Sequence, residues 1–174
     1  MDVVTVVDAT PDHLPGVAAI YTHYVLKTTI TFNTSVRTPV EWLDRYESNI
    51  IRGPYTMLVA LRQDEVVGYV ETGRFRPHEA YDGSVETSVY VAPDEVGAGI
   101  GGLLYTALFE RLASESFHRA YAVVALPNPG SVAFHERFGF EHRGTLTEAG
   151  NKFGRWLDVA YYERALGSRE AESP

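Results

Sequence analysis

Residues 86–105, with the sequence E-T-S-V-Y-V-A-P-D-E-V-G-A-G-I-G-G-L-L-Y, decide the fold of this chain. Residues of alternating polarity run up to position 91, which predicts a strand with Glu86 on its more polar face. Pro93 ends this strand because proline has no N–H to donate to a sheet. Apolar residues then recur at helical spacing from Ile100 to Leu112. The stretch therefore predicts a strand, a glycine-rich turn and a helix in direct succession.

The turn between this strand and helix has the composition of an anion site. Free N–H groups and the positive end of the helix dipole meet at a helix N-terminus, where an anion can bind to main chain alone. No Lys or Arg occurs between Arg76 and Arg111, and Asp94 and Glu95 stand just before the turn. We therefore expect binding through backbone donors, with little dependence on salt. Four glycines leave that backbone bare: Gly97, Gly99, Gly101 and Gly102.

Composition narrows the class of protein. The 174 residues, 45% hydrophobic and 22% charged, suit one globular domain. A net charge of −8 argues against a nucleic-acid partner. The absence of cysteine excludes disulfides, a thiolate nucleophile and cysteine metal ligands, and no metal is expected. No apolar run approaches a membrane span, and the first eight residues lack the basic region of a secretory signal, so we expect a cytoplasmic protein with no membrane partner.

The remaining elements predict an α+β order. Thr38, Pro39 and Glu41 form a capping-box start for one helix. One domain is expected over residues 1–164, followed by a tail at 165–174. The mixture of hairpins with one βαβ crossover differs from the strict alternation of a doubly wound sheet. Strands are predicted at about 3–7, 56–61, 66–72, 85–91, 121–126, 141–146 and 156–164, and helices at about 10–26, 38–51, 100–116 and 128–138.

The strand–turn–helix stretch resembles the GNAT superfamily of acetyl-CoA-dependent N-acetyltransferases. That family has a strand ending in V-x-V-x-P and a loop of the form R/Q-x-x-G-x-G/A. Gly99 and Gly101 match the two glycines, whereas Val96 stands where Arg or Gln is usual. The alternative is a dinucleotide-binding unit, whose G-x-G-x-x-G spacing fits Gly97, Gly99 and Gly102. The order of elements favours the GNAT interpretation.

Residues 126–140, L-P-N-P-G-S-V-A-F-H-E-R-F-G-F, carry a second resemblance. With E-T-S-V-Y-V upstream and A-G-N-K-F-G-R-W-L-D-V at 149–159, they resemble the phosphinothricin acetyltransferase branch. Two segments depart from that branch. T-F-N-T-S at 31–35 lacks the usual Arg and Glu, and F-R-P-H-E-A-Y at 75–81 replaces W-K-x-R-x-A-Y. Whether phosphinothricin itself is acetylated is therefore left open.

The resemblance implies a mixed, mostly antiparallel sheet of about seven strands flanked by about four helices, with acetyl-CoA as co-substrate. It implies that the pantetheine arm pairs with the edge of the motif strand and that the pyrophosphate binds the glycine turn. The residues implied for the cofactor are Val89, Tyr90, Val91, Gly97, Ala98, Gly99, Ile100, Gly101, Gly102, Asn128 and Ser131. Asn128 followed by a proline is also the pattern of an ordinary helix N-cap.

The resemblance implies Glu86 as the base that removes a proton from the attacking amine, and His135 as a relay or as the acid that protonates the CoA thiolate. A desolvated carboxylate has a raised pKa suited to this task. Both residues have an ordinary alternative: Glu86 as a solvated carboxylate or half of an ion pair, and His135 as a histidine hydrogen-bonded in the core.

For the acceptor, the resemblance points to Phe32, Arg74, Arg76, His78 and Lys152. Guanidinium groups favour carboxylate or phosphinate, so we expect a small amino acid such as methionine sulfone, methionine sulfoximine or phosphinothricin. A homodimer is usual in the branch.

Two alternatives remain. One is an acetyltransferase for another amine, such as a polyamine, an aminoglycoside or a protein N-terminus, with Glu71, Glu79 and Asp82 lining the site for a cationic acceptor. The other is a non-catalytic acyl-CoA-binding module.

Overall fold

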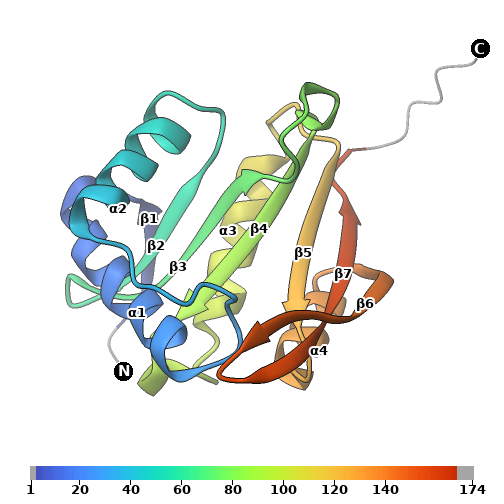
Figure 1. The fold of residues 1–174 in the computed structure, drawn as a ribbon. Coiled ribbons are helices and arrows are strands. Elements are labelled where there is room, and N and C mark those ends of the chain that lie inside the picture. Colours follow the sequence, from blue (N-terminus) through green and yellow to red (C-terminus); the bar gives the residue numbers. More distant parts are fainter. Residues whose placement is uncertain (1–2, 168–174) are drawn as a thin grey trace, which may run out of the picture.

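Seven strands form one sheet in the computed structural model, which describes residues 3–167 (Figure 1). Their order across the sheet is β1-β2-β3-β4-β5-β7-β6. Neighbours are antiparallel except β4 and β5, which run parallel. The predicted mixed, mostly antiparallel sheet is confirmed. The strands are β1 (Thr5–Asp8), β2 (Met57–Arg62), β3 (Glu65–Arg74), β4 (Ser84–Val91), β5 (Arg119–Ala125), β6 (Glu141–Lys152) and β7 (Arg155–Ala165).

Four α-helices cover the two faces of the sheet: α1 (Leu14–Lys27), α2 (Pro39–Tyr46), α3 (Ile100–Leu112) and α4 (Pro129–Arg137). Helices α1 and α2 lie on one face, and α3 and α4 lie on the other (Figure 1). Each face has its own core: Leu104, Tyr105 and Leu108 of α3 are buried in one, and Val17 and Trp42 in the other. Among the described residues, no helix is both long and apolar enough to cross a membrane.

Several elements differ from the predicted bounds. The helix predicted over 38–51 is α2 followed by a π-helical turn at Glu47–Ile51. Strand β6 runs on to Lys152 because its pairing with β7 resumes after an irregularity between Leu146 and Gly150, which interrupts the alternation. Helix α3 ends at Leu112, short of 116. Of the predicted tail, residue 165 belongs to β7, and 168–174 lie outside the described residues.

Strands β4 and β5 pair only at their start. The paired positions are Ser84 with Arg119, Val85 with Ala120, and Glu86 with Tyr121. Beyond them β4 continues to Val91 beside β3 alone, while β5 pairs on with β7. Figure 1 shows the two strands moving apart along their length. The β5-facing edge of β4 therefore carries backbone groups that no strand of the described chain pairs.

The capping box at α2 gives a test of the fold. Thr38 accepts from the Glu41 N–H at 3.3 Å, and Glu41 accepts from the Thr38 N–H at 2.6 Å, as the sequence predicted. Thr38→Ala removes this cap and should lower the free energy of unfolding by about 1 kcal/mol. Urea unfolding would measure the change, with Thr34→Ala, at an exposed position on the same loop, as the matched control. Equal stability of the two variants would contradict the assignment.

Candidate active site

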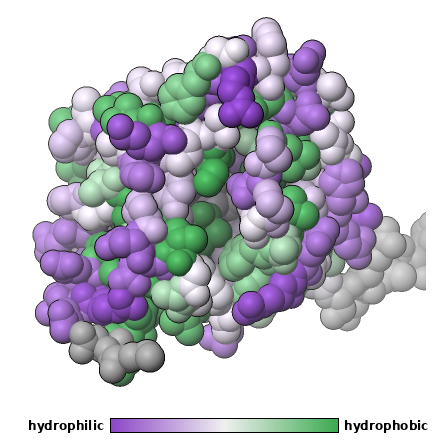
Figure 2. Space-filling view, turned by 90° about the horizontal axis from the view of Figure 1, so that it is seen from below, coloured by the Kyte–Doolittle hydropathy of each residue, from purple (hydrophilic) through white to green (hydrophobic). Residues whose placement is uncertain are grey.

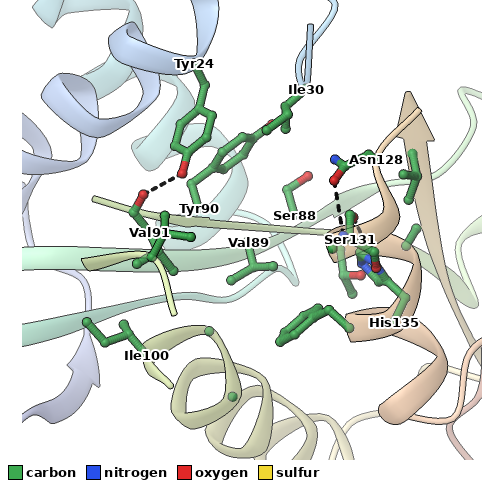
Figure 3. A pocket seen from close by; sticks show the side chains of 18 of the residues that line it. Tyr24, Ile30, Ser88, Val89, Tyr90, Val91, Ile100, Asn128, Ser131 and His135 are labelled. Atoms are coloured by element: carbon green, nitrogen blue, oxygen red, sulfur yellow. Dashed lines mark hydrogen bonds between the residues drawn. The ribbon is translucent and has the colours of Figure 1, made fainter. Parts of the chain in front are cut away.

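A cavity of about 510 Å³ lies where β4 and β5 separate. Its walls are the second half of β4, the facing part of β5, the turn before α3, and α4. Figure 2 shows a hollow in this end of the molecule, with hydrophobic residues in its floor. Figure 3 shows the side chains that project into it from β4, α3 and α4, with Tyr24 and Ile30 on the opposite wall. The gap in the sheet is therefore an accessible site.

The glycine turn forms one end of the cavity. Gly97 and Gly99 have φ values of +90° and +84°, a conformation that other residues adopt only with strain. Gly99 is the N-cap of α3, whose first N–H groups have no acceptor within the helix. Ala98 is outside the lining, and its N–H donates to the carbonyl of Glu95 at 3.1 Å. The other residues predicted for the phosphates line the cavity: Gly97, Gly99, Ile100, Gly101 and Gly102.

Charged side chains around this turn modify the prediction that an anion binds here through backbone donors alone. Glu95 forms an ion pair with Arg62 of β2, which offsets the acidic charge beside the turn. Arg137, at the end of α4, lines the cavity, and its Nη2 lies 3.5 Å from where a Cβ on Gly102 would stand. Within residues 3–167, no carboxylate lies within 4.0 Å of the Arg137 guanidinium. The sequence does not identify this cation, because Arg137 is distant from the turn along the chain and reaches it only through the placement of α4.

The predicted pantetheine residues Val89, Tyr90 and Val91 all line the cavity. The Tyr24 hydroxyl donates to the Val91 carbonyl at 2.7 Å, so α1 contacts β4 directly (Figure 3). Tyr24 and Ile30 carry no motif, and sequence reasoning did not find them. They join the site because α1, which carries Tyr24, and the segment after it, which carries Ile30, lie against this end of the cavity.

Asn128 and Ser131 also line the cavity, on the side of α4. The Asn128 side chain accepts from the Ser131 N–H at 3.1 Å, which confirms its N-cap role (Figure 3). This bond fixes the start of α4 beside the cavity and leaves the Asn128 amide NH₂ for other contacts.

His135 is buried, with 6% of its surface exposed, and both ring nitrogens have partners. Nδ1 lies 2.7 Å from the carbonyl of Ser131, so it carries the proton and donates it. Nε2 then accepts from the Tyr105 hydroxyl at 3.0 Å, and that hydroxyl lies 3.0 Å from Thr87 Oγ1. Burial lowers the pKa of His135, which favours the neutral ring. His135 thus has the ordinary core role, and its acid role stays a prediction.

Glu86 lies where β4 and β5 still pair, on the same face of β4 as Ser88 and Tyr90. It stands just outside the cavity lining, which begins one residue later. Within residues 3–167 no group hydrogen-bonds its carboxylate, so it is not half of an ion pair.

Burial raises the pKa of Glu86. The Arg76 and Arg45 guanidinium groups oppose that rise, and Glu71 adds to it. Its base role stays a prediction.

Arg76 is held by aromatic rings near Glu86. Its guanidinium stacks over Phe75 at 4.4 Å and donates to the Tyr161 hydroxyl at 3.2 Å. Phe75 in turn stacks on Tyr121, with ring centroids 3.9 Å apart, and Tyr121 pairs opposite Glu86 across the sheet. The structure therefore brings Arg76 and Glu86 to the same end of the gap.

The other predicted acceptor residues are arranged differently, and none lines the cavity. Arg74 forms an exposed ion pair with Asp82 at 2.9 Å, and His78 is exposed on the same loop. The ring of Phe32 packs against Gly150 and leaves no room for a Cβ at that position.

Lys152 is almost wholly buried, with 2% exposed. Its ammonium donates to the carbonyls of Thr31 at 2.7 Å and Tyr24 at 3.4 Å. Burial lowers its pKa. In this arrangement Lys152 ties the end of β6 to the segment after α1, and sequence reasoning could not separate that link from contact with substrate.

Comparisons with known proteins agree with this geometry. The family model for the acetyltransferase (GNAT) domain matches residues 8–160. The chain belongs to the GNAT acetyltransferase family. The predicted enzyme class, N-acetyltransferase, is thereby confirmed, and the non-catalytic module is set aside.

Relatives of this GNAT chain come from the branch that the motifs indicated. It is 48% identical over 160 residues to a phosphinothricin N-acetyltransferase of Streptomyces coelicolor, covering 89% of this chain and 92% of that protein. It is 39% identical to an L-methionine sulfoximine/L-methionine sulfone acetyltransferase of Pseudomonas aeruginosa, covering 91% and 92%. A solved phosphinothricin acetyltransferase from Sinorhizobium meliloti, in complex with acetyl-CoA, superposes with a TM-score of 0.92 at 34% identity, covering 98% and 92%.

The features of this GNAT site fit acetyl-CoA chemically. An unpaired strand edge can hydrogen-bond the amides of a pantetheine arm. The bare turn, the start of α3 and Arg137 offer donors and a cation to a pyrophosphate.

Proposed function

We propose that this chain transfers the acetyl group of acetyl-CoA to the amine of a small anionic amino acid of the methionine sulfone, methionine sulfoximine or phosphinothricin type. Transfer is direct, within a ternary complex of enzyme, acetyl-CoA and acceptor. The observation that carries the proposal is the position of Glu86, a half-buried carboxylate without a hydrogen-bond partner in residues 3–167, at the point where β4 and β5 stop pairing. Acetyl-CoA enters from the α3 side and the acceptor from the Glu86 side.

In this reaction the amine nitrogen attacks the thioester carbonyl, the new C–N bond forms and the C–S bond breaks. Glu86 takes the proton that the nitrogen loses, directly or through water, because its raised pKa makes it a better base than an exposed glutamate. Backbone N–H groups along the free edge of β4 stabilise the charge on the carbonyl oxygen. CoA leaves as a thiolate, which is already a good leaving group, so His135 contributes less than Glu86.

Charge near Glu86 supports an anionic acceptor over a cationic one. Two of the three acidic residues that could line a site for a polyamine are paired: Glu71 with Arg45 at 3.0 Å, and Asp82 with Arg74 at 2.9 Å. Arg76, held over Phe75, has no carboxylate within 4.0 Å among the described residues. Its guanidinium is suited to a carboxylate, phosphinate or sulfone oxygen.

We also propose that the protein is cytoplasmic and forms a homodimer. Three apolar side chains on the β6–β7 hairpin are more than half exposed: Leu146, Phe153 and Trp156. Such a surface is typical of a protein interface, which supports a dimer formed through this hairpin.

Thiol release from acetyl-CoA tests the base and the acceptor class together. With methionine sulfone, Glu86→Gln should lower kcat by at least about 100-fold, because the amide cannot take the proton. The protein has no cysteine and adds no thiol background. His135→Gln serves as the comparison and should lose less. Turnover with polyamines alone would reject the proposed acceptor, and an unimpaired Glu86→Gln would reject the base.

Arg76 is expected to recognise the anionic end of the acceptor. Arg76→Ala should raise the KM for methionine sulfone roughly tenfold or more, since one charge-assisted hydrogen bond is lost. The KM for acetyl-CoA should stay unchanged. Arg74→Ala, which breaks an exposed ion pair on the same loop, indicates how much of any effect comes from loop disorder. An unchanged acceptor KM in Arg76→Ala would remove this residue from the site.

Arg137 is expected to bind the phosphates of acetyl-CoA. Arg137→Gln should raise the Kd for acetyl-CoA roughly fivefold and make it less sensitive to ionic strength, because an exposed cation–phosphate contact is screened by salt. Isothermal titration at two salt concentrations measures both. Arg52→Gln, the same charge change after α2, is the control. Identical salt dependence in Arg137→Gln and the wild type would contradict a role for Arg137 and favour binding of the phosphates by backbone N–H groups alone.

A further inference from the structure

A charged pair beneath the acceptor end of the site has no part in the motifs. Arg45 of α2 binds Glu71 of β3 through two contacts, Nη2 to Oε1 at 3.0 Å and Nε to Oε2 at 3.2 Å. The Glu71 side chain is 8% exposed and that of Arg45 is 30% exposed. This two-point geometry fixes the plane of the guanidinium.

The register of the sheet places this guanidinium beside Glu86. Gly73 of β3 pairs directly opposite Glu86 of β4, and two residues earlier Glu71 pairs opposite Ser88. Because side chains alternate along a strand, Glu71 and Glu86 share one face of the sheet. Gly73 puts no side chain between them, and Arg45 Nη2 lies 3.8 Å from where a Cβ at residue 73 would stand. With no side chain at residue 73, the Arg45 guanidinium lies next to the strand position that pairs with Glu86.

We propose that the Arg45–Glu71 pair is a positioning element for Glu86: it holds a guanidinium beside Gly73, on the face of the sheet that Glu86 shares, and thereby stabilises the ionised form of that carboxylate. The proposal rests on the function proposed for Glu86 and adds a group that sets the charge state of the base.

The groups that face Glu86 divide by sign. Arg45 approaches from α2 and Arg76 from the loop after β3, and both favour the ionised carboxylate. Glu71 of β3 opposes ionisation, as burial does. On β5, Tyr121 gives its hydroxyl to Glu163 at 3.0 Å. Removing Arg45 should therefore raise the pKa of Glu86, and removing the charge of Glu71 should lower it.

A purely structural ion pair predicts a different pattern. Buried pairs contribute little net stability, while loss of either partner destabilises the fold by leaving the other charge unpaired. Arg45→Gln and Glu71→Gln would then act in the same direction, on stability alone. Opposite effects on Glu86 are specific to the positioning role.

The test is a titration of Glu86 in the free protein by ¹³C NMR, with glutamate labelled at Cδ. The spectrum of Glu86→Gln assigns the resonance. In Arg45→Gln the midpoint should move up by about half a pH unit or more, and in Glu71→Gln it should move down by a similar amount. Arg45→Lys keeps the charge without the two-point geometry and should give a smaller rise. It also keeps the test usable if Arg45→Gln does not fold.

The matched controls are Arg52→Gln and Glu47→Gln, which break an exposed pair at 3.8 Å just after α2 and should leave the midpoint in place. Midpoints that stay fixed, or that move in the same direction in Arg45→Gln and Glu71→Gln, would overturn the proposal.

Measurements of turnover distinguish the positioning role of the Arg45–Glu71 pair from the proposal that Glu86 is the base. If Glu86 is the base, the pH dependence of kcat/KM for methionine sulfone should follow the midpoint in each variant. A midpoint that moves without any change in the pH dependence of turnover would keep the positioning role and reject Glu86 as the base.

Discussion

The site depends on one limit in the sheet: β4 and β5 pair over three positions and then separate. Helix α3 packs under the β2–β3–β4 side of the sheet, next to the gap. Helix α3 reaches the sheet because Gly68 is bare, so that Ile100 Cγ2 lies 3.0 Å from where its Cβ would stand. On its other edge, β5 pairs with β7 at seven positions, beyond the point where its pairing with β4 has ended. The separation leaves a strand edge unpaired in the middle of a sheet, a position that is costly unless a ligand pairs with it. The free edge therefore lies beside the turn and the start of α3, which line the same cavity.

At the end of the site proposed for the phosphates, the positive charge comes from groups close to the glycine turn. The chain carries a net charge of −8, and its proposed co-substrate is a polyanion. The ion pair between Arg62 and Glu95 offsets an acidic residue beside the turn, and Arg137 adds a cation from the opposite wall. Together with the dipole of α3, these groups place positive charge at the end of the cavity where the phosphates are proposed to bind.

What could be predicted from sequence was the part encoded by local pattern. The alternation over 86–91, the glycines of the turn and the capping box at Thr38 specify backbone within a few residues, and the structure has all three. The missed features are contacts between distant parts of the chain. Lys152 reaches Thr31 across 121 positions, and Arg45 reaches Glu71 across 26. No periodicity distinguishes a buried lysine that binds carbonyls from one that binds a substrate, because that depends on which elements pack together.

The end of the site proposed for the acceptor shows what a carboxylate would need, besides burial, to act as a base. Burial alone would make Glu86 a strong base but also leave it protonated, and a protonated carboxyl accepts no proton. Ion pairing alone would keep it ionised but weak, with its lone pairs occupied. Here the two guanidinium groups act without hydrogen-bonding it: Arg45 is held by Glu71, and Arg76 by Tyr161 and the ring of Phe75. Their positive charge favours ionisation, and no group within residues 3–167 hydrogen-bonds the carboxylate oxygens. Because each guanidinium is held by a partner other than Glu86, neither would have to move if Glu86 acted as the proposed base and took up a proton.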